Sequence, residues 1–241
     1  MSYVFKKDLV SYSKYNIKCP YNIKADFIVV HNTYNDAPAI NEVNYMKNNN
    51  NEVSFHVAID DKEVIQVVDF NRNTWACGDG TYSKGGNMKG ISIEICYSKS
   101  GGERYNKAEE NSVKYIAKLL YERNWGIDRV RSHKECTEVG LKLGYSKYVK
   151  NCPHRIYDEK RWSSFKKRIE KELEHLHNGV EIIKEDDIMN LLNATGRDEC
   201  KKMIQKGVKE GLFSSKHENI EKYTDVELLS YALAYVNRKL K

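Results

Sequence analysis

Three residues of types that commonly bind metals stand far apart in this sequence, and together they constrain the fold more than any other feature. His31 ends the apolar run 27–30. His133 follows the segment 130–132, and Cys152 stands just before a proline. Two imidazoles and one thiolate are good zinc ligands, and three protein ligands leave a fourth position for water. Because a structural zinc site normally closes with four ligands, we interpret the pattern as the catalytic zinc centre of a hydrolase.

Apolar runs of strand length predict a central β-sheet around this centre. Residues 27–31 form a continuous apolar run without a wet face, as in a buried strand. In residues 91–96, isoleucines alternate with other residues, so that Glu94 lies on the polar face of a strand. We therefore expect an α/β fold, in which helices flank a mixed central sheet. Further strands are expected at 55–60, 64–68 and 130–133, helices at 38–46, 107–123 and 158–176, and an exposed, flexible glycine-rich loop at 78–90.

A second, smaller domain is expected after the helix 158–176. The glycine at position 179 favours the end of this helix. Helical patterns follow at 185–193, 197–210 and 225–240, and Thr224 stands three residues before Glu227, as in a capping box. This part contains no catalytic constellation. We divide the chain into a catalytic domain, residues 1–178, and a small all-α domain, residues 179–241.

The composition limits where such a protein acts. No stretch of the 241 residues is apolar for long enough to cross a bilayer. Residues 1–8 lack an apolar signal region, so we expect the protein to be made and held in the cytoplasm. The six cysteines include no closely spaced pair and do not suggest a disulfide framework. All of them except Cys152 are more typical of small buried side chains or incidental thiols.

The net charge of +6 comes from the first domain. Residues 1–180 hold 29 Lys and Arg against 23 Asp and Glu, whereas residues 181–241 hold 11 of each. A basic domain is attracted to anionic polymers, among them Gram-positive cell wall and nucleic acid. A merely lysine-rich surface explains the charge equally well. Because no reading helix and no aromatic RNA motif is found, we expect no nucleic acid partner.

Four segments carry a family resemblance and occur in one order along the chain. They are His-Asn-Thr at 31–33, Val-Ser-Phe-His-Val-Ala-Ile-Asp at 53–60, Ile-Ser-Ile-Glu-Ile-Cys at 91–96 and Lys-Asn-Cys-Pro-His-Arg at 150–155. In this order they resemble the type 2 N-acetylmuramoyl-L-alanine amidases, relatives of the peptidoglycan recognition proteins and of T7 lysozyme. Residues 31–38, 52–58 and 75–80 are most similar to endolysins of phages that infect Gram-positive spore-formers. The resemblance covers roughly residues 1–175 and implies the same α/β architecture.

The resemblance implies that His31, His133 and Cys152 hold one Zn²⁺ per catalytic domain. His154 competes with Cys152 by proximity, but the family pattern places the metal on the cysteine and leaves His154 as a wall of the site. The interval between His133 and Cys152 is longer than in compact relatives, and we expect a lid or a substrate rim there. Two histidines at 175 and 177 do not face one another on a helix, which argues against a second metal site.

Glu94 and Lys150 are the candidate catalytic residues. Family members with Ile-Glu at the place of Glu94 use the glutamate near the zinc-bound water, although an edge-strand carboxylate facing solvent is the alternative. Lys150 precedes Cys152 by two residues, so in an extended segment the two side chains share a face. Its ammonium is then placed to stabilise an oxyanion, a role that the resemblance also implies, although lysine is abundant in this chain.

One position departs from the family pattern. T7 lysozyme carries a functional tyrosine just before the histidine that matches His56, and this chain has Phe55 there. A phenylalanine cannot donate a hydrogen bond, so the tyrosine's role is absent or passes to Glu94. His56 lies within a strand pattern, and we expect it to support the site from behind or to pack in the core. The candidate substrate contacts, chosen as aromatic or hydrogen-bonding side chains, are Asn32, Thr33, Tyr34, Trp75, Asp79 and His154.

The implied reaction is hydrolysis of the amide between N-acetylmuramic acid and L-alanine in bacterial peptidoglycan. The implied role is that of a phage or prophage endolysin, held in the host cytoplasm until a holin pore gives access to the wall. We expect the C-terminal helices to recognise a wall polymer or to position the enzyme, without insertion into a membrane. A non-catalytic peptidoglycan-binding protein and a host autolysin are the alternatives.

Overall fold

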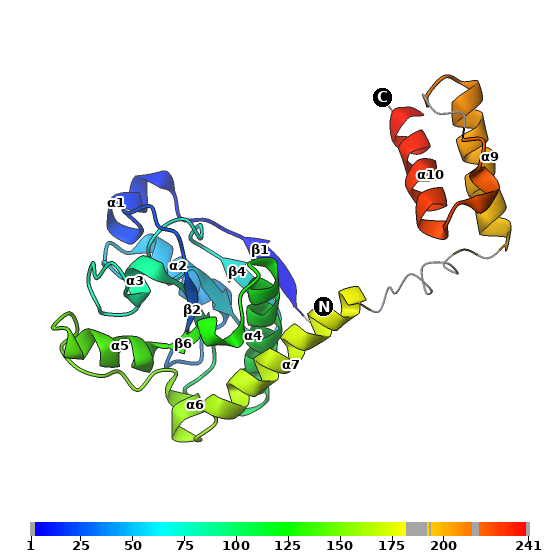
Figure 1. Ribbon diagram of the computed structural model, residues 1–241. Coiled ribbons are helices and arrows are strands. Elements are labelled where there is room, and N and C mark those ends of the chain that lie inside the picture. The colour runs from blue at the N-terminus through cyan, green and yellow to red at the C-terminus, as the bar shows by residue number, and fades with distance from the viewer. Residues whose placement is uncertain (1–2, 182–191, 193, 214–216, 240–241) are drawn as a thin grey trace. The chain divides into compact units, whose positions relative to one another are not determined.

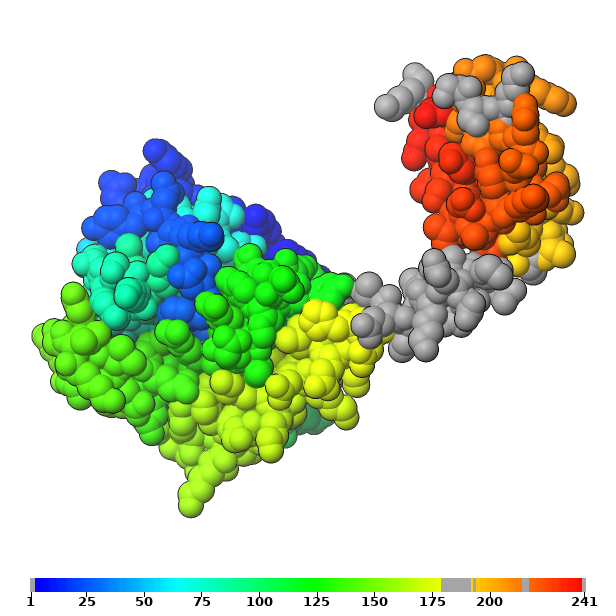
Figure 2. All heavy atoms as spheres, in the orientation of Figure 1, coloured from blue at the N-terminus to red at the C-terminus, as the bar shows by residue number. Residues whose placement is uncertain are grey.

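A computed structural model describes residues 3–181, 192, 194–213 and 217–239 (Figure 1). The chain divides into two compact units, Met1–Leu176 and His177–Lys241, which Figure 2 shows with all heavy atoms. The division falls inside helix α7 (Trp162–Glu181), two residues before the expected domain boundary. Each unit is therefore described by itself.

A six-stranded mixed sheet forms the centre of the first unit, as the strand patterns predicted. The strand order is β1 (Val4–Lys7), β4 (Glu63–Gln66), β3 (Val57–Ile59), β5 (Gly90–Ile95), β2 (Phe27–Asn32) and β6 (Val130–Ser132). Strands β3, β5, β2 and β6 run parallel to one another, whereas β4 is antiparallel to β3 and parallel to β1. Parallel strands send their carboxyl ends to one edge of a sheet, which is where ligand sites form in such folds.

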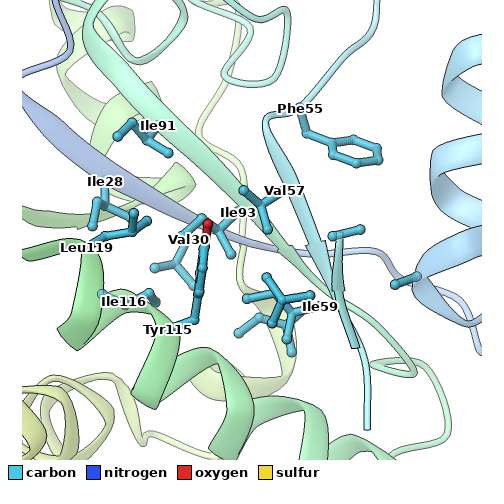
Figure 3. Packing of buried hydrophobic residues seen from close by; sticks show 14 of the residues in the cluster. Ile28, Val30, Phe55, Val57, Ile59, Ile91, Ile93, Tyr115, Ile116 and Leu119 are labelled. Carbon is cyan, nitrogen blue, oxygen red and sulfur yellow. The ribbon is translucent and has the colours of Figure 1, made fainter. Parts of the chain in front are cut away.

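The main core lies between one face of this sheet and helix α4 (Gly102–Glu122). Figure 3 shows Ile28 and Val30 of β2 meeting Ile116 and Leu119 of α4. The even positions of β2 therefore face α4, and its odd positions face the other way. On that opposite face, Phe27 and Val29 pack with Cys77 and Cys136. His31 shares this second face.

Helix α7 is held to α4 by a buried acid with two cationic partners. Glu109 of α4 is only 4% exposed, and its Oε1 accepts from Arg161 at 2.7 Å. Arg168, almost two turns further along α7, bonds to the same carboxylate. The shorter elements of this unit are η1 (Tyr12–Lys14), α1 (Tyr15–Lys18), α2 (Ala39–Asn48), α3 (Gly86–Lys89), η2 (Ile127–Arg129), α5 (His133–Lys142) and α6 (His154–Asp158).

Several expectations need correction. Helix α4 begins at Gly102, five residues before the predicted start, and α7 begins at Trp162 because α6 occupies residues 154–158. Helix α7 also continues past the predicted glycine stop, since one glycine costs a helix only about 1 kcal/mol. The loop 78–90 is not an exposed coil, because Asp79 and Asn87 are buried and α3 lies within it.

The second unit contains α9 (Ala194–Lys209), η3 (Ile220–Lys222) and α10 (Asp225–Lys239). These helices correspond to the patterns at 197–210 and 225–240, whereas the helix expected at 185–193 lies outside the described residues apart from residue 192. Ile204 and Leu228 are fully buried in a small core of their own. Thr224 and Glu227 form the predicted capping box, with a 2.8 Å bond from the Thr224 N–H to the carboxylate. Across the described parts of both units, every helix is too short or too polar to span a bilayer.

Candidate active site

Three parallel strands carry the candidate residues to one edge of the sheet. His31 lies near the end of β2, in register with Glu94 of β5. Strand β6 pairs with β2 up to Ser132, which caps α5, so that His133 becomes the first residue of that helix. The Ser132 side chain accepts from the Glu135 N–H and Glu135 bonds back to the Ser132 N–H, which fixes where α5 starts. His31, Glu94 and His133 thereby lie at the same edge.

Cys152 reaches this edge from the loop before α6. The Asn32 N–H at the end of β2 donates to the Cys152 Sγ at 3.4 Å. The Asn32 side chain accepts from the Arg155 N–H at 3.2 Å, and the Lys134 N–H donates to the Cys152 carbonyl at 2.9 Å. These bonds join the loop to both histidine-bearing elements. The candidate ligand atoms of His31, His133 and Cys152 all lie within 4.8 Å of one another.

The two imidazoles face each other through their Nδ1 atoms, which are 3.1 Å apart. Burial, and then the proximity of His133, lower the pKa of His31 well below its ordinary value. Burial likewise lowers the pKa of His133 to about 4, and the charge of Lys150 acts in the same direction. Both rings are therefore neutral at pH 7, as metal ligands must be. The thiol of Cys152 is also neutral without a cation, because burial and then the charge of Glu94 raise its pKa to about 12.

Glu94 adds a carboxylate to this group. Its Oε1 lies 4.0 Å from the His31 Nδ1, and its Oε2 is buried with no hydrogen-bond partner in the described part of the chain. Burial, and then the charge of Glu42, raise the pKa of Glu94 to about 8. The carboxylate opens on a cavity of about 140 Å³, whose walls include Thr33, Tyr45 and Phe55. A carboxyl group in this setting can take and return a proton near neutral pH.

Lys150 lies at the rim of the site. Its ammonium stands over the Tyr148 ring, 5.0 Å from the centroid. The backbone N–H of Lys150 donates to the Thr137 Oγ1 at 3.0 Å. The segment is not extended as expected, because the Cys152 N–H bonds to the Lys150 carbonyl in a tight turn. Even so, the charge of Lys150 is near enough to act on the pKa values of both His133 and Cys152.

The six candidate substrate contacts fall into two groups. Thr33 borders the cavity at Glu94, and its hydroxyl is buried without a partner among the described residues. Tyr34 is 69% exposed, and its ring lies edge-on to His154 with the centroids 4.5 Å apart. These two rings line a second cavity of about 230 Å³ beside Arg155. Tyr34 and His154 are therefore accessible to a ligand, whereas the Thr33 hydroxyl is buried at the border of the Glu94 cavity.

The other three side chains are already bonded within the fold. The Asn32 amide holds the Arg155 N–H, and the Trp75 indole donates to the Ile17 carbonyl at 2.9 Å. Both carboxylate oxygens of Asp79 accept from backbone N–H groups at the start of α3, those of Gly86 and Asn87. A substrate contact by Asp79 would cost these bonds, so its carboxylate holds the loop instead.

His56 lies beneath the site. Its Nε2 bonds to the Arg72 carbonyl at 2.9 Å, and its Nδ1 accepts from the Ser92 N–H at 3.0 Å. Both ring nitrogens are used by the backbone, so His56 is not free to bind a metal. Phe55, where a tyrosine was the family alternative, forms part of the wall of the Glu94 cavity.

Two residues near the site were not predicted. Cys77 was expected to be an inert buried thiol, but its Sγ lies 3.9 Å from the His31 Nε2. Glu42 of α2 contributes a second carboxylate to the Glu94 cavity and accepts from the Asn35 amide at 2.6 Å. The motif 75–80 pointed to the region of Cys77, whereas no local pattern distinguishes Glu42 from a surface acid.

The fold and this arrangement define a class of α/β proteins with a candidate metal site of two histidines and one cysteine at the edge of a mixed sheet. Residues 21–155 match the family Amidase_2, described as N-acetylmuramoyl-L-alanine amidase, and the chain belongs to this family. The matched segment contains every residue of the candidate centre. The family resemblance found in the sequence is thus confirmed.

Individual relatives agree with this assignment. N-acetylmuramoyl-L-alanine amidase CwlA from Bacillus subtilis (strain 168) is 54% identical over 170 residues, which are 70% of this chain and 58% of that protein. The chain thus spans well under two thirds of that relative. The solved structure of PlyL is 52% identical, with a TM-score of 0.62 over 69% of this chain and 97% of that one. A mutant endolysin from Bacillus subtilis is 33% identical, with a TM-score of 0.58 over 69% of this chain and 99% of that one.

Proposed function

We propose that the chain is a zinc-dependent amidase that hydrolyses the bond between N-acetylmuramic acid and L-alanine in bacterial peptidoglycan. The observation that carries the proposal is the convergence of two imidazole nitrogens and one sulfur beside a largely buried carboxylate. Membership of the amidase family supports the choice of this bond. One ion per catalytic domain is expected, held by His31, His133 and Cys152.

The donor set fits zinc. Two ligand nitrogens of a tetrahedral zinc site lie about 3.3 Å apart, and the Nδ1 atoms of His31 and His133 are separated by 3.1 Å. Both imidazoles are neutral and present lone pairs, and a bound cation would favour the thiolate of Cys152. When bound, zinc supplies a Lewis acid for the scissile carbonyl and lowers the pKa of the attacking water.

The chain's own residues supply the proton transfers. Glu94 accepts the proton of the attacking water and returns it to the nitrogen of the leaving L-alanine, so that the amide becomes a carboxylate and an amine. Burial raises the pKa of Glu94 to about 8 without a metal ion, which favours the protonated form that donates to the leaving amine. A cation bound nearby would lower this pKa and so favour the carboxylate that accepts the proton of the water. Lys150 carries a positive charge at the rim, where it stabilises the negative charge that develops on the carbonyl oxygen.

Substrate binding is assigned to the accessible residues around this centre. The unpartnered hydroxyl of Thr33 hydrogen-bonds the stem peptide beside Glu94. The rings of Tyr34 and His154 form an apolar wall for a sugar face or for peptide carbon. Asn32 and Trp75 act indirectly, by shaping the loops that carry these groups.

The biological role that we propose is that of a phage or prophage endolysin, supported by the similarity to a solved endolysin. It is expected to remain in the host cytoplasm until a holin pore admits it to the wall. The second unit is proposed to bind a wall polymer and so to concentrate the catalytic unit on its substrate. A host autolysin would share the chemistry and differ only in its route to the wall.

The test uses the full chain and purified Gram-positive cell walls. Zinc content, newly freed L-alanine N-termini and newly freed reducing sugars are measured for the wild type and for Glu94→Gln. We expect one zinc in both proteins, release of L-alanine N-termini by the wild type only, and no new reducing sugars. A loss of about 100-fold or more in the Gln variant is expected for a missing general base.

Two results would contradict the proposal. Wall binding without any new N-termini would make the chain a non-catalytic peptidoglycan-binding protein. Reducing sugars in place of N-termini would move the cleaved bond from the stem peptide to the glycan.

A further inference from the structure

The outer nitrogen of His31, which is turned away from the zinc position, faces a cysteine. The Nε2 of His31 lies 3.9 Å from the Sγ of Cys77. The Nε2 of His133 is buried and has no hydrogen-bond partner within the described chain. Cys77 thus lies behind the His31 ring.

The proton positions of the two rings matter because each neutral imidazole carries only one proton. With the Nδ1 atoms 3.1 Å apart, a metal-free site favours one Nδ1–H that donates to the other ring. Binding a cation between them requires both Nδ1 lone pairs, so that each ring must hold its proton on Nε2. An acceptor that faces Nε2 favours this arrangement.

We propose that Cys77 is the positioning residue of the metal centre, which selects the Nε2–H form of His31 through its sulfur. The inference rests on the proposed zinc function and extends it beyond the three ligands. The change of form moves one proton from Nδ1 to Nε2 of a ring and leaves the charge of the ring unchanged. Cys77 cannot itself join the ion, because Nε2 and Nδ1 of His31 point in opposite directions.

The surroundings of Cys77 are built to hold it in this place. The Asn87 Oδ1 accepts from the N–H groups of Ala76 at 2.9 Å and Cys77 at 2.8 Å. Asp79 in turn accepts from the N–H groups of Gly86 and Asn87. These bonds form a closed set between the loop 75–80 and the start of α3.

Gly86 completes the pocket. A Cβ added to Gly86 would overlap the Cys77 Sγ, so that only glycine leaves room for the sulfur behind His31. Cys136 of α5 lies next to the same point and belongs to the same buried cluster, but no bond from it to either histidine is found among the described residues. The Cys136 thiol also interacts with that of Cys77, so its substitution serves as the control for packing in this cluster.

The test compares Cys77→Ala with Cys136→Ala in the full chain. Zinc affinity is measured by competition with a chromophoric chelator, and the imidazole ¹⁵N shifts of His31 and His133 are recorded with and without zinc. Loss of an outer partner of a metal ligand typically lowers affinity by about 10–100-fold, and we expect a loss of this size in Cys77→Ala only. We also expect the His31 shifts to change in Cys77→Ala, because the partner of its Nε2 is lost.

The outcomes separate this inference from the proposed function. A wild type that binds no zinc would overturn both. Equal zinc affinity in the wild type and Cys77→Ala, with unchanged His31 shifts, would overturn the role of Cys77 alone. Equal losses in Cys77→Ala and Cys136→Ala would also overturn it, because they would reflect cluster packing. Cys77→Ser, which keeps an acceptor of similar size, is expected to recover part of the affinity and guards against a folding defect in the alanine variant.

Discussion

At the scale of single residues, the first unit keeps its buried histidines neutral. His56 illustrates this, because its Nδ1 accepts a backbone N–H and its Nε2 donates to a carbonyl. A proton added to Nδ1 would remove that acceptor and leave a charge in the core. Burial accordingly lowers the pKa of His56 to about 4, although the bond to Arg72 acts against this.

This lowered pKa predicts acid sensitivity. The unfolded chain takes up a proton at His56 near pH 6.5, whereas the folded chain does so only near pH 4. The contribution of His56 to stability is therefore complete above about pH 6.5. It falls by up to about 3 kcal/mol as the pH drops to about 4.

Urea unfolding of the wild type and His56→Gln at pH 7.5 and pH 5 checks this. The glutamine variant should lose less stability between the two pH values, because its side chain does not titrate. Both proteins keep the metal-site histidines, so their effects cancel. Identical pH dependence in the two proteins would contradict the assignment.

The candidate metal ligands could be proposed from sequence because each of His31, His133 and Cys152 occurs in a recognisable segment, and the structure brings their ligand atoms within 4.8 Å of one another. Cys77 could not be assigned its place in the same way. In the loop around Cys77, backbone N–H groups donate to the side chains of Asp79 and Asn87. In a regular helix or strand they would donate to backbone carbonyls instead. Bonds of this kind leave no periodic pattern, so that a buried loop reads as an exposed one.

At the scale of helices and strands, sequence periodicity was informative where an element has one wet and one dry face. Helix α4 has such a stripe, and its interior was predicted even though its start was not. Strand β1 was missed because all four of its residues are exposed at the sheet edge. Charged side chains are usual on such edges, where they prevent pairing with other chains.

The contact between α4 and α7 carries a prediction of its own. Glu109→Ala removes the buried acid that bonds Arg161 and Arg168, and we expect the free energy of unfolding to fall by about 2–3 kcal/mol. Glu110→Ala is the matched control, since Glu110 is 41% exposed and forms surface ion pairs with Lys107 and Lys114. That change should cost about 1 kcal/mol or less. The free energies of unfolding of the two variants are measured by thermal or denaturant unfolding. Equal losses in the two variants would argue against the role of Glu109 in holding α7 to α4.

At the scale of the whole molecule, the chain combines a larger unit, which carries the candidate active site, with a small helical one. The structural similarity to the solved PlyL chain covers 97% of that chain and 69% of this one, so part of this chain lies outside the match. The second unit has its own core around Ile204 and Leu228. Catalysis and wall attachment are therefore expected to be separable.

A truncated chain ending at residue 181 tests this separation and retains all of α7. We expect it to turn over a soluble muramyl peptide at the rate of the full chain and to pellet much less with intact walls. The excess of positive charge lies in the first unit, so any remaining pelleting of the truncated chain with cell walls is expected to decrease as salt is added. Unchanged pelleting would reject the targeting role of the second unit.

The absence of a side chain at Gly86 has a consequence for how such a protein tolerates change. A single methyl group there would push a sulfur toward an imidazole, although the glycine itself touches neither a substrate nor an ion. Saturation mutagenesis scored by cell lysis should therefore rank this position beside the ligands, in a stretch that would otherwise pass for a dispensable linker. Designers who recombine such proteins would do well to transplant α3 together with the strand that carries His31.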